Sequence, residues 1–486
     1  MKKSFKSILI VAAAVLFSTC SLSDFGDLNR NPNATTIPVT SALLTNVLSG
    51  LGGWTQGMNE GLYSQYFSET QYTDASLYSI IQVNFTGNYS GAMYDLQNII
   101  DNNTNPDTKD EVLANGSNAN QIAVARILLV YHYIHQTDRF GDVPYSEALT
   151  GNAKPVYDTQ ADIYKGFYKE LKEAIAQFDN GLAAQGDILF DGDKTKWKKF
   201  ANSLRLILAM RLSKADATLG KAEFAAAFAD PAGYLSSAAD DVTVYYPGAA
   251  FKNPWFNLYD GRKDYAISTV MVDQLKAWND PRLQAFGNPN AQGIVKGVPY
   301  GLTRDAAIAF TNANADWSQI LAPKWRTQSS PLVVLSASQV LLTIAEAIHL
   351  GWVSGDKAKF YADGIKASWE RWEVYDEQRF LGYIQPTGIG TELIALTGDA
   401  SDLQKINLQK WVAIYPDGRS GWTEWRRTNT PVLTPTPSAV STSKLIPRRF
   451  SYPSVEYNLN RANLDAALGR LGTADNQDGR VWWDKQ

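Results

Sequence analysis

The chain of 486 residues has a single cysteine, Cys20, and only three histidines. One cysteine cannot form an internal disulfide bond, so the fold has no disulfide framework. His132 and His135 stand at positions i and i+3, a spacing that could share a metal ion. However, the chain lacks a His-Glu-x-x-His sequence, and no third ligand can be identified. We therefore expect both histidines to be structural, and we predict no metal site and no cofactor.

Sequence signatures of catalysis are also missing. The chain has no Gly-x-Ser-x-Gly turn and no Gly-x4-Gly-Lys-Ser/Thr phosphate loop. The nearest approach places Ser420 two residues after Gly418, but Trp422 stands where the second glycine belongs. A carboxylate pair for glycoside hydrolysis is a spatial arrangement that a sequence does not reveal. We predict no catalytic residue and no enzyme, and a surface-anchored glycan hydrolase stays as an alternative.

The chain carries little excess charge, with a formal net charge of −4. Nucleic-acid binding needs clustered lysine and arginine, so this acidic balance argues against nucleic acid as a partner. Aromatic residues are plentiful instead, with 14 Trp and 24 Tyr. Both combine a broad apolar face with a polar edge, which suits stacking on neutral sugars or contacting peptide side chains.

Apolar runs long enough to cross a membrane are missing as well. The longest stretch, Ile8–Phe17, has ten residues, against about 20 for a spanning helix. It follows a basic start and precedes Cys20, in the order of a secretory signal. The arrangement resembles a bacterial lipoprotein signal, so we predict a signal peptide over residues 1–19 and a lipid anchor on Cys20. Residues 20–39 read as a lipidated tether that holds the protein on a membrane.

The rest of the chain is predicted to be mainly α-helical, as a single domain over residues 40–486. Apolar residues recur at helical spacing in many segments, including 123–140, 160–178 and 195–213. Strand-like runs are few, at 241–246 and 330–335, so we do not expect a doubly wound sheet or a β/α barrel. Residues about 230–332 are rich in proline, glycine and aromatics and form a loop-rich insertion, where binding sites are often found.

Motifs spread over nearly the whole chain resemble the SusD/RagB family of outer-membrane nutrient-binding lipoproteins, in particular its SusD-like, starch-binding-associated branch. They occur in the family's order. The matching segments are FGDLNRNPNA (25–34), TDRFGDVPYSEAL (137–149), PVYDTQADIY (155–164), WKKFANSLRLILAMRLS (197–213), NDPRL (279–283), LLTIAEAIHLGW (341–352), YADGIKASWERW (361–372), QKWVAIYPDGRSGWTEWRR (409–427), IPRRFSYPSVEYNLN (446–460) and VWWD (481–484).

The resemblance implies degenerate tetratricopeptide-like helix pairs with a loop-rich variable half packed on them. It implies a lipid-anchored protein on the outer membrane, facing outward. The implied partner is a SusC-like TonB-dependent barrel, over which the protein works as a lid for nutrient uptake. The expected ligand is an oligosaccharide. Some family members bind oligopeptides, and some carry a structural calcium ion, so both remain open. An assembly scaffold without a small ligand is a further alternative.

Aromatic residues in irregular stretches are the candidate ligand contacts. Tryptophans on helical stripes (Trp197, Trp369, Trp372, Trp411) and in the family motifs (Trp422, Trp425, Trp482, Trp483) are expected to pack in the core instead. The ligand-binding candidates are Tyr72, Tyr78, Tyr89, Trp255, Tyr259, Tyr300, Trp317 and Trp325.

Two further patterns receive structural interpretations. Asp191, Asp193 and Thr195 match the first three ligand positions of a calcium loop, but the sixth position is Lys196 rather than glycine. We interpret this stretch as a turn followed by a helix cap. The arginine pairs 426–427 and 448–449 are expected to anchor carboxylates or loop carbonyls rather than ligands.

Overall fold

The computed structural model describes residues 37–385 and 394–485. Residues Thr40–Gln486 form one compact unit, which is mainly helical, with three short two-stranded ribbons. This confirms the predicted fold class. The predicted signal peptide, Cys20 and most of the tether lie outside the described residues. Among the residues that are described, no helix is both long and apolar enough to cross a membrane.

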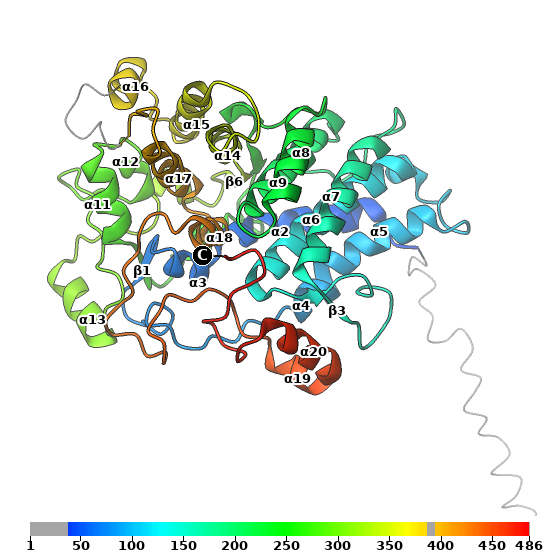
Figure 1. Ribbon diagram of the computed structural model, residues 1–486, viewed down its shortest axis with the longest axis horizontal. Coiled ribbons are helices and arrows are strands. Elements are labelled where there is room, and N and C mark those ends of the chain that lie inside the picture. Colours follow the sequence, from blue (N-terminus) through cyan, green and yellow to red (C-terminus); the bar gives the residue numbers. More distant parts are fainter. Residues whose placement is uncertain (1–36, 386–393, 486) are drawn as a thin grey trace, which may run out of the picture. The chain divides into compact units, whose positions relative to one another are not determined.

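Helices from the first half of the unit stack side by side (Figure 1). In this stack α5 packs on α6, α6 on α7, α7 on α8 and α8 on α9. The first helix, α2, packs on α5. Antiparallel neighbours of this kind are the tetratricopeptide-like pairs that the motifs predicted. The bounds are α2 Thr40–Gln56, α3 Met58–Tyr63, α4 Thr86–Asn88, η2 Tyr89–Met93, α5 Tyr94–Thr104, η3 Leu113–Asn115, α6 Asn118–Phe140, α7 Gln160–Gln177, α8 Lys194–Arg211 and α9 Ala217–Phe228.

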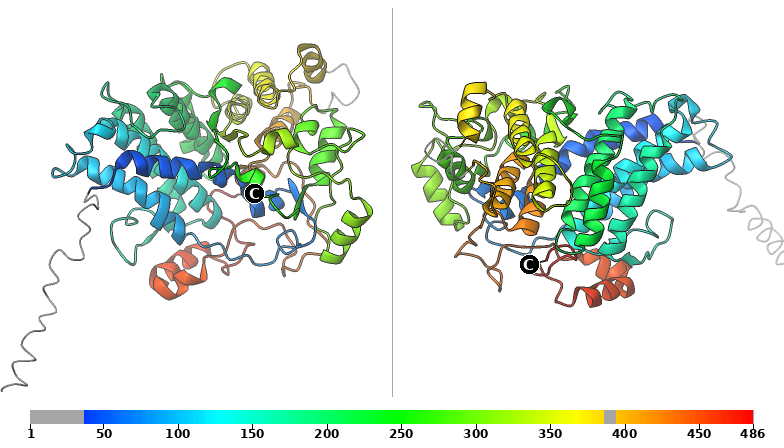
Figure 2. Two further views of the ribbon diagram at one scale, coloured as in Figure 1. Left: turned by 180° about the vertical axis from the view of Figure 1, so that it is seen from behind. Right: turned by 45° about the horizontal axis from the view of Figure 1, so that its top comes forward.

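The stack continues with helices from later in the chain. Here α14 packs on α8 and also on α15 and α17, and α17 packs on α18 (Figure 2). α18 returns to pack on α2 and α3, so a late helix contacts the first two helices of the compact unit. The bounds are α14 Ala337–His349, α15 Lys357–Arg371, α16 Glu377–Ile384, α17 Ser401–Ile414, α18 Gly418–Thr428, α19 Ser454–Leu459 and α20 Arg461–Leu471.

The loop-rich segment contains short helices and one strand from each of two ribbons. In Figure 1, α11 and α12 lie on the same side of the molecule as α16 and α17, and α13 lies below them. The bounds are η4 Ala238–Asp240, α10 Pro254–Asn257, α11 Thr269–Ala277, α12 Leu283–Phe286, α13 Arg304–Ala313 and η5 Pro323–Arg326. The strands are β1 Phe67–Glu69 with β5 Tyr265–Ile267, β2 Val143–Pro144 with β3 Tyr157–Asp158, and β4 Val242–Val244 with β6 Leu332–Leu335, all antiparallel.

Local sequence signals fix where several helices begin. The side chains of Thr159, Asp193 and Ser336 each accept a hydrogen bond from a backbone N–H in the first turn of α7, α8 and α14. Such caps satisfy N–H groups that have no partner within the helix. Asp193 bonds to the backbone of Thr195 and Lys196, which confirms the cap interpretation of this stretch.

Several charged side chains in the core are paired. Arg427 makes two hydrogen bonds to Glu346, at 2.8 and 2.7 Å, and also contacts Glu424. Arg426 donates to the backbone carbonyls of Arg448 and Asp138, each at 2.7 Å. The other pair behaves alike, with Arg448 bound to Asp484 and Arg449 to Asp475, each at 2.6 Å. The structural interpretation of the four arginines is therefore confirmed.

Candidate functional site

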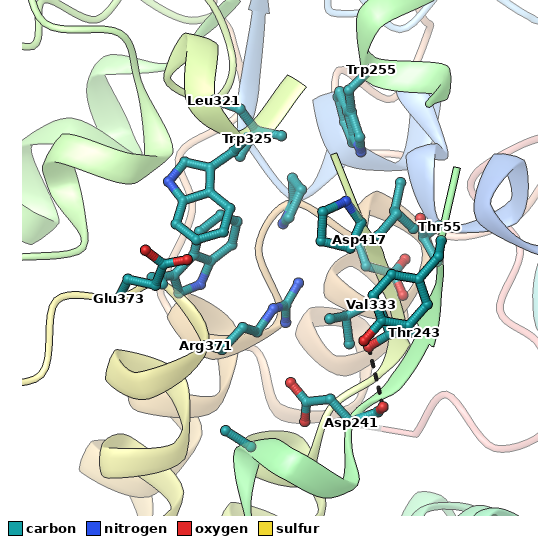
Figure 3. Close-up of a pocket in the computed structure, with 16 residues that line it drawn as sticks. Thr55, Asp241, Thr243, Trp255, Leu321, Trp325, Val333, Arg371, Glu373 and Asp417 are labelled. Carbon is teal, nitrogen blue, oxygen red and sulfur yellow. Dashed lines mark hydrogen bonds between the residues drawn. The ribbon is translucent and has the colours of Figure 1, made fainter. Parts of the chain in front are cut away.

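The β4–β6 ribbon forms one wall of a pocket (Figure 3). Val244 pairs with Leu332, and both are buried against the core, while Thr243 and Val333 are half-buried. Such alternation of buried and half-buried residues is typical of a strand with one face on the core. The two strand-like runs of the sequence predicted strands at these positions. Tyr245 comes directly after β4 and is 68% exposed.

A cluster of tryptophans forms the opposite wall. Trp325 on η5 packs edge-on against Trp372, which follows the end of α15, with ring centroids 5.2 Å apart. Trp255, on α10, lies deeper and is 1% exposed. Pro254 occupies the first position of α10 and Asn253 caps it, so this short turn holds the indole in place. Glu373, the next residue after Trp372, forms an ion pair with Lys324.

The charged groups of the pocket are Arg371, Asp241, Asp417 and Glu373. Arg371 ends α15, and its guanidinium points toward the middle of the lining residues in Figure 3. It makes no hydrogen bond or ion pair with any other described residue, although its charge lies near Asp241 and Asp417. Burial lowers the pKa of Arg371. A guanidinium has five N–H donors, so these remain available to a ligand.

The two carboxylates lie at the starts of helices. One oxygen of Asp241 accepts a hydrogen bond from the backbone N–H of Ala337 at 2.7 Å, in the first turn of α14. Asp417 caps α18 through the backbone N–H of Ser420 at 3.0 Å. Burial raises the pKa of Asp241 to about 7 and that of Asp417 to about 6. Both groups therefore carry less than full negative charge near neutral pH, and they add hydrogen-bonding oxygens beside Arg371.

The pocket has a volume of about 210 Å³. It combines apolar aromatic faces with a few convergent polar groups, the usual composition of a small-molecule site. The positive charge of Arg371 is offset by the nearby carboxylates, so the arrangement suits a neutral ligand rich in hydroxyl groups. The indoles of Trp325 and Trp372 add apolar surface that suits a sugar ring. Lys324 lies over the ring of Trp325 at 4.9 Å and Arg371 over that of Trp372 at 5.0 Å, so a sugar would contact the remaining surface of each ring.

A larger hollow, of about 800 Å³, lies between α5, α6 and α7. Its main cation, Arg126, is already bound to Glu170 at 2.7 Å and to Gln177 at 3.0 Å. Polar groups that satisfy one another offer less to a ligand than a free guanidinium does. We therefore take the pocket around Arg371 as the candidate site.

Two of the eight predicted ligand contacts line this pocket, Trp255 and Trp325. Tyr259 lies nearby on the same segment, but its hydroxyl is engaged, donating to the backbone of Tyr265 at 3.0 Å and accepting from that of Ile320 at 2.8 Å. It is a half-buried residue that supports the loops around the pocket.

The other five predicted contacts do not line the pocket. Tyr78 has no exposed surface and packs in the core, so it presents no face to a ligand. Tyr89 donates to the carbonyl of Pro144 at 2.6 Å and packs on neighbouring rings. Tyr300 and Trp317 are half-buried.

Tyr72, the last of the five, is 47% exposed. The guanidinium carbons of Arg262 and Arg304 lie 4.7 and 5.1 Å from the centre of its ring. Cations at this distance attract the ring face electrostatically. These contacts tie the 71–74 stretch to the loop-rich segment.

Several lining residues were not predicted as contacts. Trp372 was expected to be core, and it is 5% exposed, yet its ring forms part of the pocket wall. Asp241, Arg371 and Asp417 lie far apart in the sequence, and no local pattern distinguishes them from other charged residues. Tyr245 had a usable signal, because it is an aromatic residue at the exposed end of a strand-like run.

The histidines are structural, as expected. His132 is fully buried, and its Nδ1 lies 3.0 Å from the side-chain oxygen of Asn88. His135 stacks on Trp54 with ring centroids 5.4 Å apart. Burial lowers the pKa of His132 to about 3, so it stays neutral. Within the described part of the chain, no group of three His, Cys, Asp or Glu side chains could hold a metal ion.

Comparisons with known proteins agree with this architecture. A SusD-like family profile, described as starch-binding and associating with the outer membrane, matches residues 32–453. A solved chitin-binding protein is 27% identical with a TM-score of 0.80, over 92% of this chain and 100% of that one.

A chitin-binding SusD homolog from Flavobacterium johnsoniae is 25% identical with a TM-score of 0.79, over 92% of this chain and 99% of its own. A SusD homolog from Bacteroides uniformis, 23% identical with a TM-score of 0.80 over 92% and 99% of the two chains, shows the shared fold alone. No curated protein matches the chain.

Proposed function

The chain belongs to the SusD-like family, and from this membership we propose that it is a cell-surface oligosaccharide-binding protein that performs no chemistry. It is anchored to the outer membrane through Cys20 and faces outward. It works as the lid of a SusC-like TonB-dependent barrel, capturing glycan for import. The family description and the two chitin-binding relatives support carbohydrate as the ligand class.

The observation that carries the ligand assignment is the pocket that joins Trp325, Trp372 and the free guanidinium of Arg371. A sugar ring needs an apolar surface for its C–H face and donors and acceptors for its hydroxyls. The tryptophans provide the first, and Arg371 with Asp241 provides the second. Their near-balanced charge disfavours a strongly acidic ligand.

Calorimetric titration tests this proposal. The chain without residues 1–20 is titrated with β-1,4-linked N-acetylglucosamine oligosaccharides and with α-1,4-linked glucose oligosaccharides. We expect heat with at least one class. Trp325→Ala removes a stacking face and should weaken binding about tenfold or more, as truncation of an interface anchor does. The matched control is Trp317→Ala, a half-buried tryptophan outside the pocket, which should leave the affinity unchanged. An equal loss in both variants would contradict the assignment of the pocket.

An oligopeptide-binding member of the family is the first alternative. Arg371 could pair with a peptide carboxylate, since guanidinium and carboxylate match in geometry. Titration with a peptide pool separates the two ligands. Binding heat with peptides, and none with either glycan class, would show that the protein binds oligopeptides instead. Silence from both would favour the scaffold alternative, provided that the protein still co-purifies with a SusC-like barrel from detergent-solubilised outer membranes.

A glycan hydrolase is the second alternative, because Asp241 and Asp417 line the same pocket with raised pKa values. Each already accepts a hydrogen bond from a helix N-terminus, which suits a structural carboxylate. Incubating the protein with the same oligosaccharides should release no shorter products. Release that disappears in Asp241→Asn would establish a hydrolase instead.

A further inference from the structure

Most of the lining of the pocket around Arg371 is buried or half-buried. Its lining residues Thr55, Trp255, Leu321, Leu332, Trp372 and Pro416 are buried. Only three lining residues are exposed, Tyr245, Pro331 and Glu373. Tyr245 and Pro331 directly follow and precede the paired residues Val244 and Leu332, so they lie together at one end of the ribbon.

The size of the pocket limits what can enter it. Its volume of about 210 Å³ is below the roughly 300–1,000 Å³ of pockets that enclose drug-sized ligands. A disaccharide is drug-sized, so the space holds one sugar ring. A ring inside a glycan chain carries neighbours on both sides and needs two exits. A ring at the end of a chain carries one neighbour and needs a single mouth.

We propose that this pocket recognises the end of a glycan chain, taking the terminal ring as a unit, rather than a stretch in its middle. The inference rests on the proposed function and specifies which part of the glycan the site reads. The terminal ring packs on Trp325 and Trp372 and hydrogen-bonds to Arg371 through its hydroxyls. Tyr245, exposed at the mouth, packs against the second ring outside.

The polar groups of the pocket suit a terminal ring. A terminal ring has one more free hydroxyl than an internal ring. Arg371 has free donors, and the second oxygen of Asp241 accepts no hydrogen bond from another described residue. Half-buried donors and acceptors without partners favour a ligand that satisfies them over one that does not.

End-blocked oligosaccharides test the inference. The six-residue β-1,4-N-acetylglucosamine and α-1,4-glucose oligosaccharides are prepared unmodified, with the reducing end linked to 2-aminobenzamide, and with the non-reducing end 4-O-methylated. Titration of the chain without residues 1–20 should show that one blocked form binds at least tenfold more weakly, while the other binds like the unmodified sugar. This result would also identify the end that is read.

The length dependence gives a second readout. Affinity per chain end should stop rising after two or three rings, with one oligosaccharide bound per protein at every length. Tyr245→Ala should weaken binding of the disaccharide and longer chains about three- to tenfold and leave the monosaccharide unchanged. The control is Tyr94→Ala, an exposed tyrosine on α5, which should change neither.

The outcomes distinguish a failure of chain-end recognition from a failure of glycan binding itself. If both blocked forms bind like the unmodified sugar, or affinity keeps rising with chain length, chain-end recognition is overturned while glycan binding stands. Loss of binding in both blocked forms of a six-residue chain would also overturn it, because one small pocket cannot read two distant ends. Silence with all of these sugars would overturn the glycan assignment itself.

Discussion

Glu346→Gln should destabilise the protein far more than the same change on its surface. Glu346 on α14 lies in a cluster with Lys410 on α17 and with Glu424 and Arg427 on α18, and all four side chains are at most 7% exposed. The cluster holds two acids and two bases, so its charges balance. Burial alone raises the pKa of Glu346, but Arg427 and Lys410 outweigh this, and the pKa lies below its usual value.

The magnitude follows from what the substitution leaves behind. Glutamine fits the same space, but it removes one negative charge and leaves Lys410 and Arg427 facing only Glu424. It also offers one acceptor where Arg427 now makes hydrogen bonds of 2.8 and 2.7 Å to two oxygens. Removing one partner of a buried ion pair costs about 3–5 kcal/mol. Because the amide keeps part of the hydrogen bonding, we expect a loss of about 3 kcal/mol.

Differential scanning calorimetry at pH 7 measures the effect. An unfolding entropy of about 2.1 cal/mol/K per residue gives about 0.9 kcal/mol/K for the Thr40–Gln486 unit, so Tm should fall by about 3 °C. The matched control is Glu370→Gln on α15. Its side chain is 37% exposed and lies 3.8 Å from Lys366, and such a pair contributes about 0.3–0.5 kcal/mol.

Salt provides a second check on the same pair of variants. Added salt screens exposed charges well and buried charges poorly. The Tm difference between Glu346→Gln and the unmodified protein should therefore persist in 0.5 M salt. At this ionic strength the Debye length is about 4 Å, so exposed ion pairs are largely screened. If Glu346→Gln lowers Tm no more than Glu370→Gln does, the argument from an unbalanced buried charge is refuted.

Three further predictions concern other parts of the chain. Asp241 binds its proton more tightly when folded, with a pKa of about 7. The folded protein therefore loses stability as Asp241 ionises, between about pH 4 and pH 7. Asparagine does not ionise, so the advantage of Asp241→Asn over the unmodified protein in urea unfolding should grow from pH 5 to pH 8. An advantage that stays constant or shrinks over this range would contradict the argument. Asp187 accepts hydrogen bonds from Trp197 Nε1 at 2.7 Å and from the backbone N–H of Gly192 at 2.9 Å. Asp187→Ala should cost about 3 kcal/mol and alter tryptophan fluorescence, and unchanged stability would refute it. Cys20→Ser should release the protein from membranes, and retention after a carbonate wash would contradict the lipid anchor.

Local patterns were enough to predict several structural roles. Asp193 was interpreted as a cap because an aspartate before a helical pattern can satisfy free N–H groups. The strand-like runs 241–246 and 330–335 contain β4 and β6, and these pair with each other. The arginines at 426–427 lie in a helical segment of an acidic chain, and both bind carboxylates or carbonyls. The cap depends on neighbours within a few residues, whereas the partners of the strands and the arginines lie far along the chain.

The candidate site could be predicted only in part. Trp255 and Trp325, which line the candidate pocket, were selected because they are large aromatic residues in irregular stretches, where binding sites are often found. The same argument selected Tyr78, which packs in the core with no exposed surface. An aromatic ring in a loop packs inward or outward depending on the segments that cover it, and those segments come from distant parts of the chain.

The sequence by itself determined the helical class, the family and the ends of many helices, because periodicity, caps and ordered motifs act over short distances. Only the tertiary structure decided which residues form the pocket. Its lining comes from α2, the β4–β6 ribbon, the ends of α10 and α15, η5 and the turn before α18. Arg371 has free donors because no other described residue makes a hydrogen bond or an ion pair with it, although its guanidinium lies 5.0 Å from the ring of Trp372. Whether a buried charge is paired depends on the whole fold, and one side chain's type does not reveal it.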